Sequence, residues 1–143
     1  MFVAMTFLMG CASLPPINTP SGRPEVTICG VGKSEMMEKT VAALSMDGFN
    51  IERTSNFQAV AGKLITNPLI ATLYGSNYDS TPEARQVWTF SDIGNNCTHI
   101  SIVVQIVTNP GSAFERVTDV STGKDGHQLQ EGLEALKKQI ESR

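Results

Sequence analysis

Three cysteines, at positions 11, 29 and 97, are the residues through which this chain could do covalent chemistry. A thiol takes up acyl groups, forms disulfides where the compartment is oxidising, or binds a metal as its thiolate. Cys29 and Cys97 both fall within expected strands. Two interpretations of this pair stay open. The pair forms a disulfide that closes a long loop and adds about 4 kcal/mol in the chain-entropy model, or it consists of two separate buried thiols.

A glycine-rich segment, residues 27–34, lies between an expected strand and an expected helix, which is where a phosphate-binding loop would lie. That loop needs glycine at its first position so that the backbone can wrap a phosphate, and Thr27 stands there instead. No expected strand ends in the aspartate that would help to hold magnesium. We therefore expect Gly30 and Gly32 to form a turn and Ser34 to cap the following helix.

Histidines and catalytic motifs supply no further site. His99 and His127 are too few and too far apart in the sequence for metal-ligand spacing, and no Gly-x-Ser-x-Gly elbow or evident pair of carboxylates occurs. We expect no metal, no cofactor and no catalytic residue. A small exported hydrolase, or an inhibitor of one, stays open as an alternative that an ordered polar cluster in a cleft would favour.

An uncharged apolar run, residues 1–10, opens the sequence. It is about half as long as a membrane-spanning helix must be, so its length excludes a transmembrane helix. Short apolar runs that end in small residues are typical of export signals. This run ends in Leu8, Met9 and Gly10, directly before Cys11.

The segment from Leu8 to Cys11 resembles the lipobox of bacterial lipoproteins, in which an aliphatic residue, a small or aliphatic residue and Gly or Ala precede an invariant cysteine. Leu8, Gly10 and Cys11 match, and Met9 is bulkier than the usual Ala or Ser. The resemblance implies that residues 1–10 are removed, that the Cys11 thiol carries a diacylglycerol, and that the new amino terminus takes a further acyl chain such as palmitate. It also implies an outer-membrane location facing the periplasm, because Ala12 stands where an aspartate retains such proteins in the inner membrane.

The segment after Cys11 supports the interpretation as an anchor. Residues 13–24 contain four prolines among small polar residues, so we expect an extended, solvated tether over residues 11–24. The Lys or Arg that normally opens an export signal is missing, and one interpretation is that translation starts upstream of Met1. Two alternatives stay open: residues 1–9 form a buried first element, or the chain is a cytosolic nucleotide-binding domain with an unprocessed N-terminus.

The pattern from residue 25 onward predicts a single α+β domain over residues 25–143. The clearest strand is 97–108, where aliphatic residues from Ile100 to Ile106 alternate with polar ones. Consecutive strands joined by short turns favour an antiparallel sheet with both helices on one face, a two-layer sandwich. Further strands are expected at 25–29, 49–54, 57–65 and 85–91, a first helix at 34–47 with Met37, Val41 and Leu44 in one stripe, and a last helix at 125–142 with Leu129, Leu133, Leu136 and Ile140 in another.

Charge and loop composition bear on the partners. A net charge of −3, from 14 acidic and 11 basic residues, argues against nucleic acid, which needs a concentrated basic surface. Two loops are candidate partner surfaces because they carry aromatic residues, Tyr74 and Tyr78 in one and Phe114 in the other. The expected partners are the lipid membrane, through Cys11, and another envelope protein. The sequence therefore predicts a membrane-anchored lipoprotein with a periplasmic binding or accessory domain and no catalysis of its own.

Overall fold

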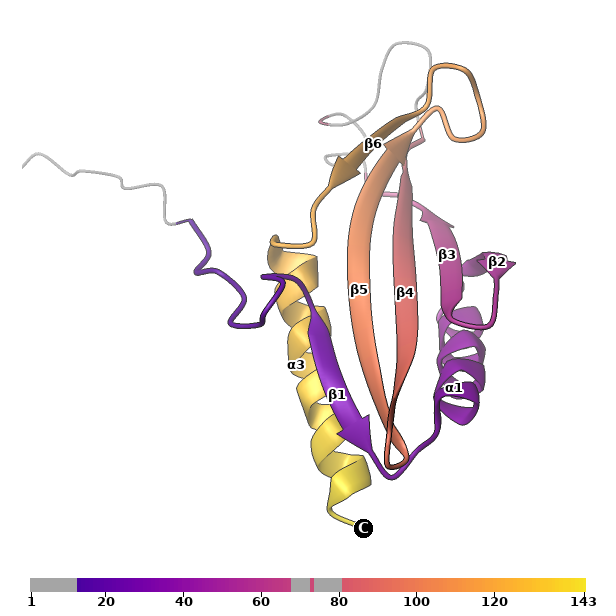
Figure 1. Cartoon of the computed structure of the whole chain (residues 1–143). Helices are drawn as coiled ribbons and strands as arrows, with labels where there is room; N and C mark the ends of the chain where they lie inside the picture. Colours follow the sequence, from indigo (N-terminus) through magenta and orange to yellow (C-terminus); the bar gives the residue numbers. More distant parts are fainter. Residues whose placement is uncertain (1–12, 68–72, 74–80) are drawn as a thin grey trace, which may run out of the picture.

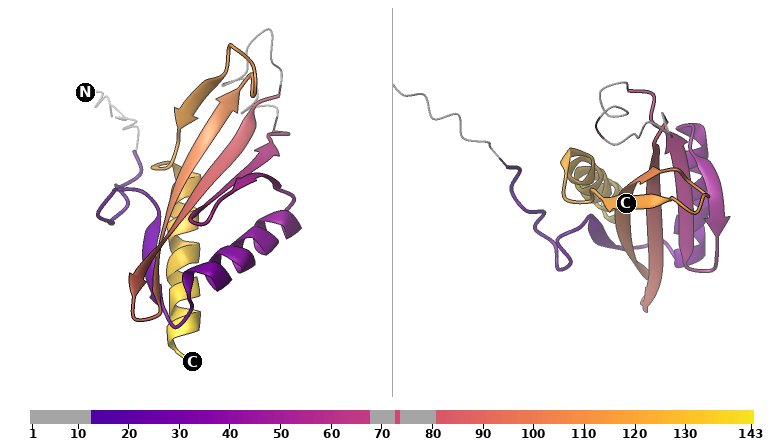
Figure 2. Two further views of the ribbon diagram at one scale, coloured as in Figure 1. Left: turned by 45° about the vertical axis from the view of Figure 1, so that its right-hand side comes forward. Right: turned by 90° about the horizontal axis from the view of Figure 1, so that it is seen from above.

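One antiparallel sheet of six strands, with two helices on one of its faces, makes up the part of the chain that the structure describes, residues 13–67, 73 and 81–143 (Figures 1 and 2). The structure is a computed structural model. Its elements, in chain order, are β1 (Glu25–Cys29), α1 (Lys33–Met46), β2 (Asn50–Thr54), β3 (Gln58–Leu64), β4 (Glu83–Gly94), β5 (Cys97–Thr108), β6 (Arg116–Asp119) and α3 (Lys124–Glu141).

The strands lie in the order β1, β5, β4, β3, β2, and every pairing among them is antiparallel. β5 is long enough to hold two neighbours on one side, because β1 pairs with residues 97–101 and β6 with residues 105–108. From β2 to β6, each strand pairs with the strand that follows it in the chain. This is the arrangement that short turns between strands predict. The α+β two-layer fold is confirmed.

Alternation along the two longest strands places the core between the sheet and the helices. Ile100, Ile102 and Val104 on β5 are buried on this face, and Trp88 and Phe90 on β4 lie beside them. The β4–β5 turn consists of Asn95 and Asn96, whose φ angles of 55° and 56° are those that a two-residue hairpin turn requires. Residues between the buried ones point to the opposite face of the sheet, which neither α1 nor α3 covers and which we call the open face (Figure 2).

Helix α1 differs from the prediction at its start and agrees with it at its end. Gly32 is the N-cap, with no side-chain hydrogen bond, so Ser34 lies inside the helix and does not cap it. At the other end Gly48 has a φ of +84°, and the amide of Phe49 donates to the carbonyl of Leu44 as in a Schellman motif. Met36, which the predicted stripe omitted, is one of the two buried residues of α1, because the helix turns this side toward the core.

The N-terminal segment is less solvated than predicted. Ile17 is only 5% exposed and lies against Gly126, where an added Cβ would collide with the carbonyl of Ser121. Arg23 forms an ion pair of 2.7 Å with Asp119. The contact of the expected tether with the domain therefore starts at Ile17, and within residues 13–24 Ile17 and Pro24 are buried whereas most of the other residues are exposed. A fragment that begins at Ser13 keeps the whole of the described core, so it contains what the domain needs to fold.

Strand β6 was not predicted. All four of its residues are exposed, and it pairs only with the second half of β5. A short, exposed edge strand carries no apolar alternation in its sequence, so the pattern that reveals buried strands is missing here.

Candidate functional site

A cleft with a volume of about 810 Å³ lies between α1 and α3. The helices are inclined to each other and lie close only near the β1–α1 connection, where a Cβ on Gly30 would contact Ile140 at 3.7 Å (Figure 2). Away from that closed end the helices diverge, and Trp88 and Gln86 of β4 form part of the floor between them. The cleft therefore exposes part of the sheet face that the helices otherwise cover.

The lining of the cleft is mostly aliphatic. Apolar side chains come from both helices and from the residues that flank α1, and they are Val31, Met36, Ala43, Leu44, Phe49, Leu129, Leu133, Leu136 and Ile140. The floor carries a satisfied polar pair, because the indole nitrogen of Trp88 donates to the amide oxygen of Gln86 at 2.9 Å. This composition is typical of a binding site for an apolar ligand.

Charged side chains line the cleft only from the helices and their ends. Glu35 and Lys39 pair with each other at 2.7 Å and are both more than half exposed. Asp47 lies at the end of α1, and Arg143 follows α3. Because these charges lie away from the sheet, the deep part of the cleft holds no charged group among the described residues.

Gly132 of α3 lines the cleft at a point where nothing lies within 4 Å of an added Cβ. Glycine costs helix stability in the middle of an exposed helix. Because Gly132 has no side chain, the surface of α3 at this position is open toward α1. The sequence pattern did not indicate a role for Gly132.

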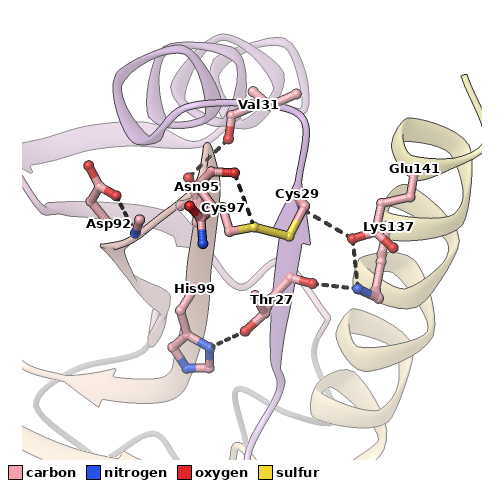
Figure 3. The surroundings of a disulfide bond; sticks show 11 residues. Thr27, Cys29, Val31, Asp92, Asn95, Cys97, His99, Lys137 and Glu141 are labelled. Carbon is pink, nitrogen blue, oxygen red and sulfur yellow. Dashed lines mark hydrogen bonds and ion pairs between the residues drawn. A yellow bond between two sulfur atoms is a disulfide. The ribbon is translucent and has the colours of Figure 1, made fainter.

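Cys29 and Cys97 lie directly opposite each other in the β1–β5 ladder, and a disulfide joins them (Figure 3). The pairing brings the end of the first strand to the start of the long one, as a bridge between them requires. The amide of Cys29 also donates to the carboxylate of Glu141 on α3, at 3.0 Å. The disulfide and α3 therefore hold the strand end that leads into the closed end of the cleft.

A row of polar side chains crosses β1 and β5 on the open face. His99 lies beside Thr27, with its Nδ1 at 3.0 Å from the Thr27 hydroxyl (Figure 3). On its other side, its Nε2 lies 3.2 Å from the Glu25 carboxylate. Burial by itself would raise the pKa of Glu25, but hydrogen bonds from Ser21 and the attraction of His99 outweigh it and hold this pKa below its ordinary value. Sequence reasoning missed the row because it depends on the β1–β5 register, which pairs Thr27 with His99.

A hydroxyl, an imidazole and a carboxylate in a row are the parts of a nucleophilic triad, so this row is the feature that would favour the hydrolase alternative. It lies on the open face of the sheet, whereas the cleft lies against α1, and so does a second, smaller cavity between α1 and the β2–β3 turn. None of its three residues lines either cavity. The row is an ordered polar cluster that borders neither of these two cavities, and its contacts link β1 to β5.

A second polar cluster on the open face surrounds Arg85, whose guanidinium lies 3.3 Å from both Glu52 and Glu83 and 3.5 Å from Glu115. Burial, together with the neighbouring carboxylate of Glu52, raises the pKa of Glu83 to about 7, against the opposing effect of Arg85. Gly62 lies under the two carboxylates, and an added Cβ there would collide with Glu52. Three carboxylates surround one guanidinium in this cluster, and the raised pKa of Glu83 means that the charge of the cluster changes with pH.

The remaining predicted site residues are placed as follows. Tyr74 and Tyr78 lie outside the described residues, and Phe114 is 80% exposed in the turn between β5 and β6. Within residues 13–67, 73 and 81–143, no group of His, Cys, Asp or Glu side chains is arranged to hold a metal ion. No helix in this part is long and apolar enough to cross a membrane.

Comparison of the chain with protein-family models, with curated proteins and with solved structures gave no match.

Proposed function

We propose that this chain is a membrane-anchored lipoprotein whose periplasmic domain binds an apolar ligand or partner in the cleft between α1 and α3. The observation that carries the binding function is the aliphatic cleft of about 810 Å³, whose size is within the range of ligand sites, roughly 300 to 1,000 Å³. The polar clusters of the described residues lie away from it, so the proposal includes no catalytic step.

The anchor is proposed from Leu8, Gly10 and Cys11, which match a lipobox. The position of Ile17 limits how far such an anchor would lie from the domain, because this residue is packed on the domain six residues after Cys11. Six extended residues reach at most about 22 Å. A lipid on Cys11 would therefore hold the domain next to the membrane surface.

Replacing Cys11 with Ala tests the anchor in the native host or a Gram-negative expression strain. We expect the Cys11→Ala protein to leave the membrane fraction or to remain unprocessed, because two or more acyl chains are what holds such a protein stably. Met9→Ala is the matched control, since alanine is more usual at that lipobox position, and it is expected to fractionate like the wild type. A Cys11→Ala protein that fractionates and migrates like the wild type would overturn the proposal.

The choice of membrane has its own test. Ala12→Asp places an aspartate directly after Cys11, where it retains lipoproteins in the inner membrane. In density-gradient separation we expect the wild type with outer-membrane markers and the variant with inner-membrane markers. Wild-type protein among the inner-membrane markers would contradict the outer-membrane location.

A further inference from the structure

We propose that the cleft between α1 and α3 binds one acyl chain of a membrane lipid. This inference names the ligand class of the cleft in the proposed function, and it rests on the proposed anchor for the source of the lipid, because the anchor would hold the cleft beside a bilayer. The recognition itself rests on the shape, the lining and the position of the cleft.

The shape favours a chain. Apolar lining residues follow α3 from Leu129 to Ile140, a distance of about 16 Å at the rise of an α-helix. One end is closed where Gly30 lies against Ile140, and the helices diverge toward the other end. An elongated apolar space with one closed end fits a linear aliphatic ligand better than a compact one.

The chemistry of the lining favours a ligand with no polar group in its buried part. The indole of Trp88 and the amide oxygen of Gln86 satisfy each other on the floor, and the charged side chains lie on the helices and their ends. A buried polar group without a hydrogen-bond partner is costly. An acyl chain has none, whereas an extended peptide would bring a row of backbone N–H and C=O groups, for which the uncharged polar side chains of the lining, Thr40, Gln86 and Gln128, are few partners.

The position of the cleft favours a membrane lipid as the source. Leu129 lies one turn after Gly126, the residue against which Ile17 packs. The chain before Ile17 leads back to Cys11 within about 22 Å. The diverging end of the cleft therefore lies on the side from which the proposed anchor reaches the membrane.

Trp88 supplies the assay, since it is the single tryptophan of the chain and lies in the floor of the cleft. The fragment 13–143, which contains the whole described core and lacks Cys11, is titrated with palmitate and with a monoacyl lysophosphatidylethanolamine below the concentrations at which they aggregate. We expect a saturable change in Trp88 emission with both ligands and no saturation with butyrate over the same range. Saturation by palmitate but not by the lysophospholipid would overturn a membrane lipid as the source.

Gly132 allows the cleft to be blocked without disturbing the core. Gly132→Phe places a ring in the open space between the helices, whereas Gly132→Ala adds only a methyl group. Both variants are expected to melt no lower than the wild type, because glycine is the poorer helix former. We expect Gly132→Phe to weaken lysophospholipid binding roughly tenfold or more and Gly132→Ala to leave it unchanged.

Three outcomes would overturn the inference: no saturable change in Trp88 emission, equal binding by a folded Gly132→Phe variant, or a fragment that is dimeric and becomes monomeric when Gly132 is replaced by Phe. The last outcome would mean that a second copy of the chain occupies the cleft. All three leave the anchor untested, since the fragment lacks Cys11. The fractionation of Cys11→Ala therefore decides the anchoring part of the proposed function separately.

Discussion

The ammonium group of Lys137 on α3 donates to the backbone carbonyl oxygen of Thr27 on β1, at 2.7 Å. It is one of three α3 side chains that pair with the outer edge of this strand, which would otherwise be free to take another strand. The other two side chains accept hydrogen bonds from backbone amides of β1. The amide oxygen of Gln130 accepts from Glu25 at 2.8 Å, and the carboxylate of Glu141 accepts from Cys29 at 3.0 Å. Helix α3 therefore both covers the core and closes this edge of the sheet.

Lys137→Met removes the donor to this edge while it keeps most of the apolar stem. We expect a loss of about 0.5 to 1.5 kcal/mol in the free energy of unfolding, since the bond is charge-assisted but partly exposed to water. Lys138→Met is the matched control on the exposed side of the helix and is expected to change the stability by less than about 0.5 kcal/mol. Urea denaturation of the fragment 13–143 measures both, and equal stabilities would show that the edge does not depend on Lys137.

The disulfide is expected to stabilise the domain through the long loop that it closes, which spans a sequence separation of 68 residues. Replacing both Cys29 and Cys97 with Ser is expected to lower the free energy of unfolding by up to about 4 kcal/mol, because the unfolded chain gains freedom. The fragment isolated from the periplasm is expected to show no free thiol under denaturing conditions. Two thiols that react with a maleimide after unfolding would contradict the bridge.

Leu133 is expected to be the most sensitive position of α3. It is 3% exposed in the core, so Leu133→Asp would bury a carboxylate that has no partner there. We expect a loss of about 3 kcal/mol or more, or failure to fold. Ala135→Asp introduces the same residue on the exposed side of the helix, and its melting temperature is expected to remain close to that of the wild type. A Leu133→Asp fragment that melts like Ala135→Asp would mean that α3 does not dock on the sheet.

Glu83 is expected to make the domain less stable as the pH rises from 5 to 8. Its pKa is raised from 4.5 to about 7 in the fold, so between these values the folded state holds a proton that the unfolded state has lost. The stability that this proton contributes is complete below pH 4.5 and is lost as the pH rises through about 7. Because water reaches part of the cluster, we expect about 1 kcal/mol over this range.

Glu83→Gln isolates this effect, since the amide does not titrate. The difference in melting temperature between pH 5 and pH 8 is expected to be smaller in this variant than in the wild type. Glu38→Gln, on the exposed side of α1, controls for the loss of a charge and is expected to keep the wild-type difference. If Glu83→Gln and the wild type respond equally to pH, the cluster around Arg85 does not titrate in this range.

Most of the elements could be predicted because their signals are local. The stripe from Leu129 to Ile140, the alternation from Ile100 to Val104 and the turn at Asn95 each lie within a few consecutive residues, and periodicity or turn chemistry reveals them. The contact of the expected tether with the domain could not be predicted in this way. Ile17 stands among prolines and small polar residues, and its burial depends on Gly126, which is more than a hundred residues away.

The features of the candidate sites divide in the same way, into those made by residues adjacent in the sequence and those made by residues far apart in it. The lipobox residues Leu8, Gly10 and Cys11 are adjacent in the chain, so the sequence by itself determined the expectation of an anchor, together with the α+β class that its periodicities require. Only the tertiary structure decided that Cys29 faces Cys97, that His99 lies between Thr27 and Glu25, and that α1 diverges from α3 to leave a cleft above Trp88. The register of an antiparallel sheet and the angle between two helices are set by packing across the whole domain, and a short stretch of sequence does not contain them.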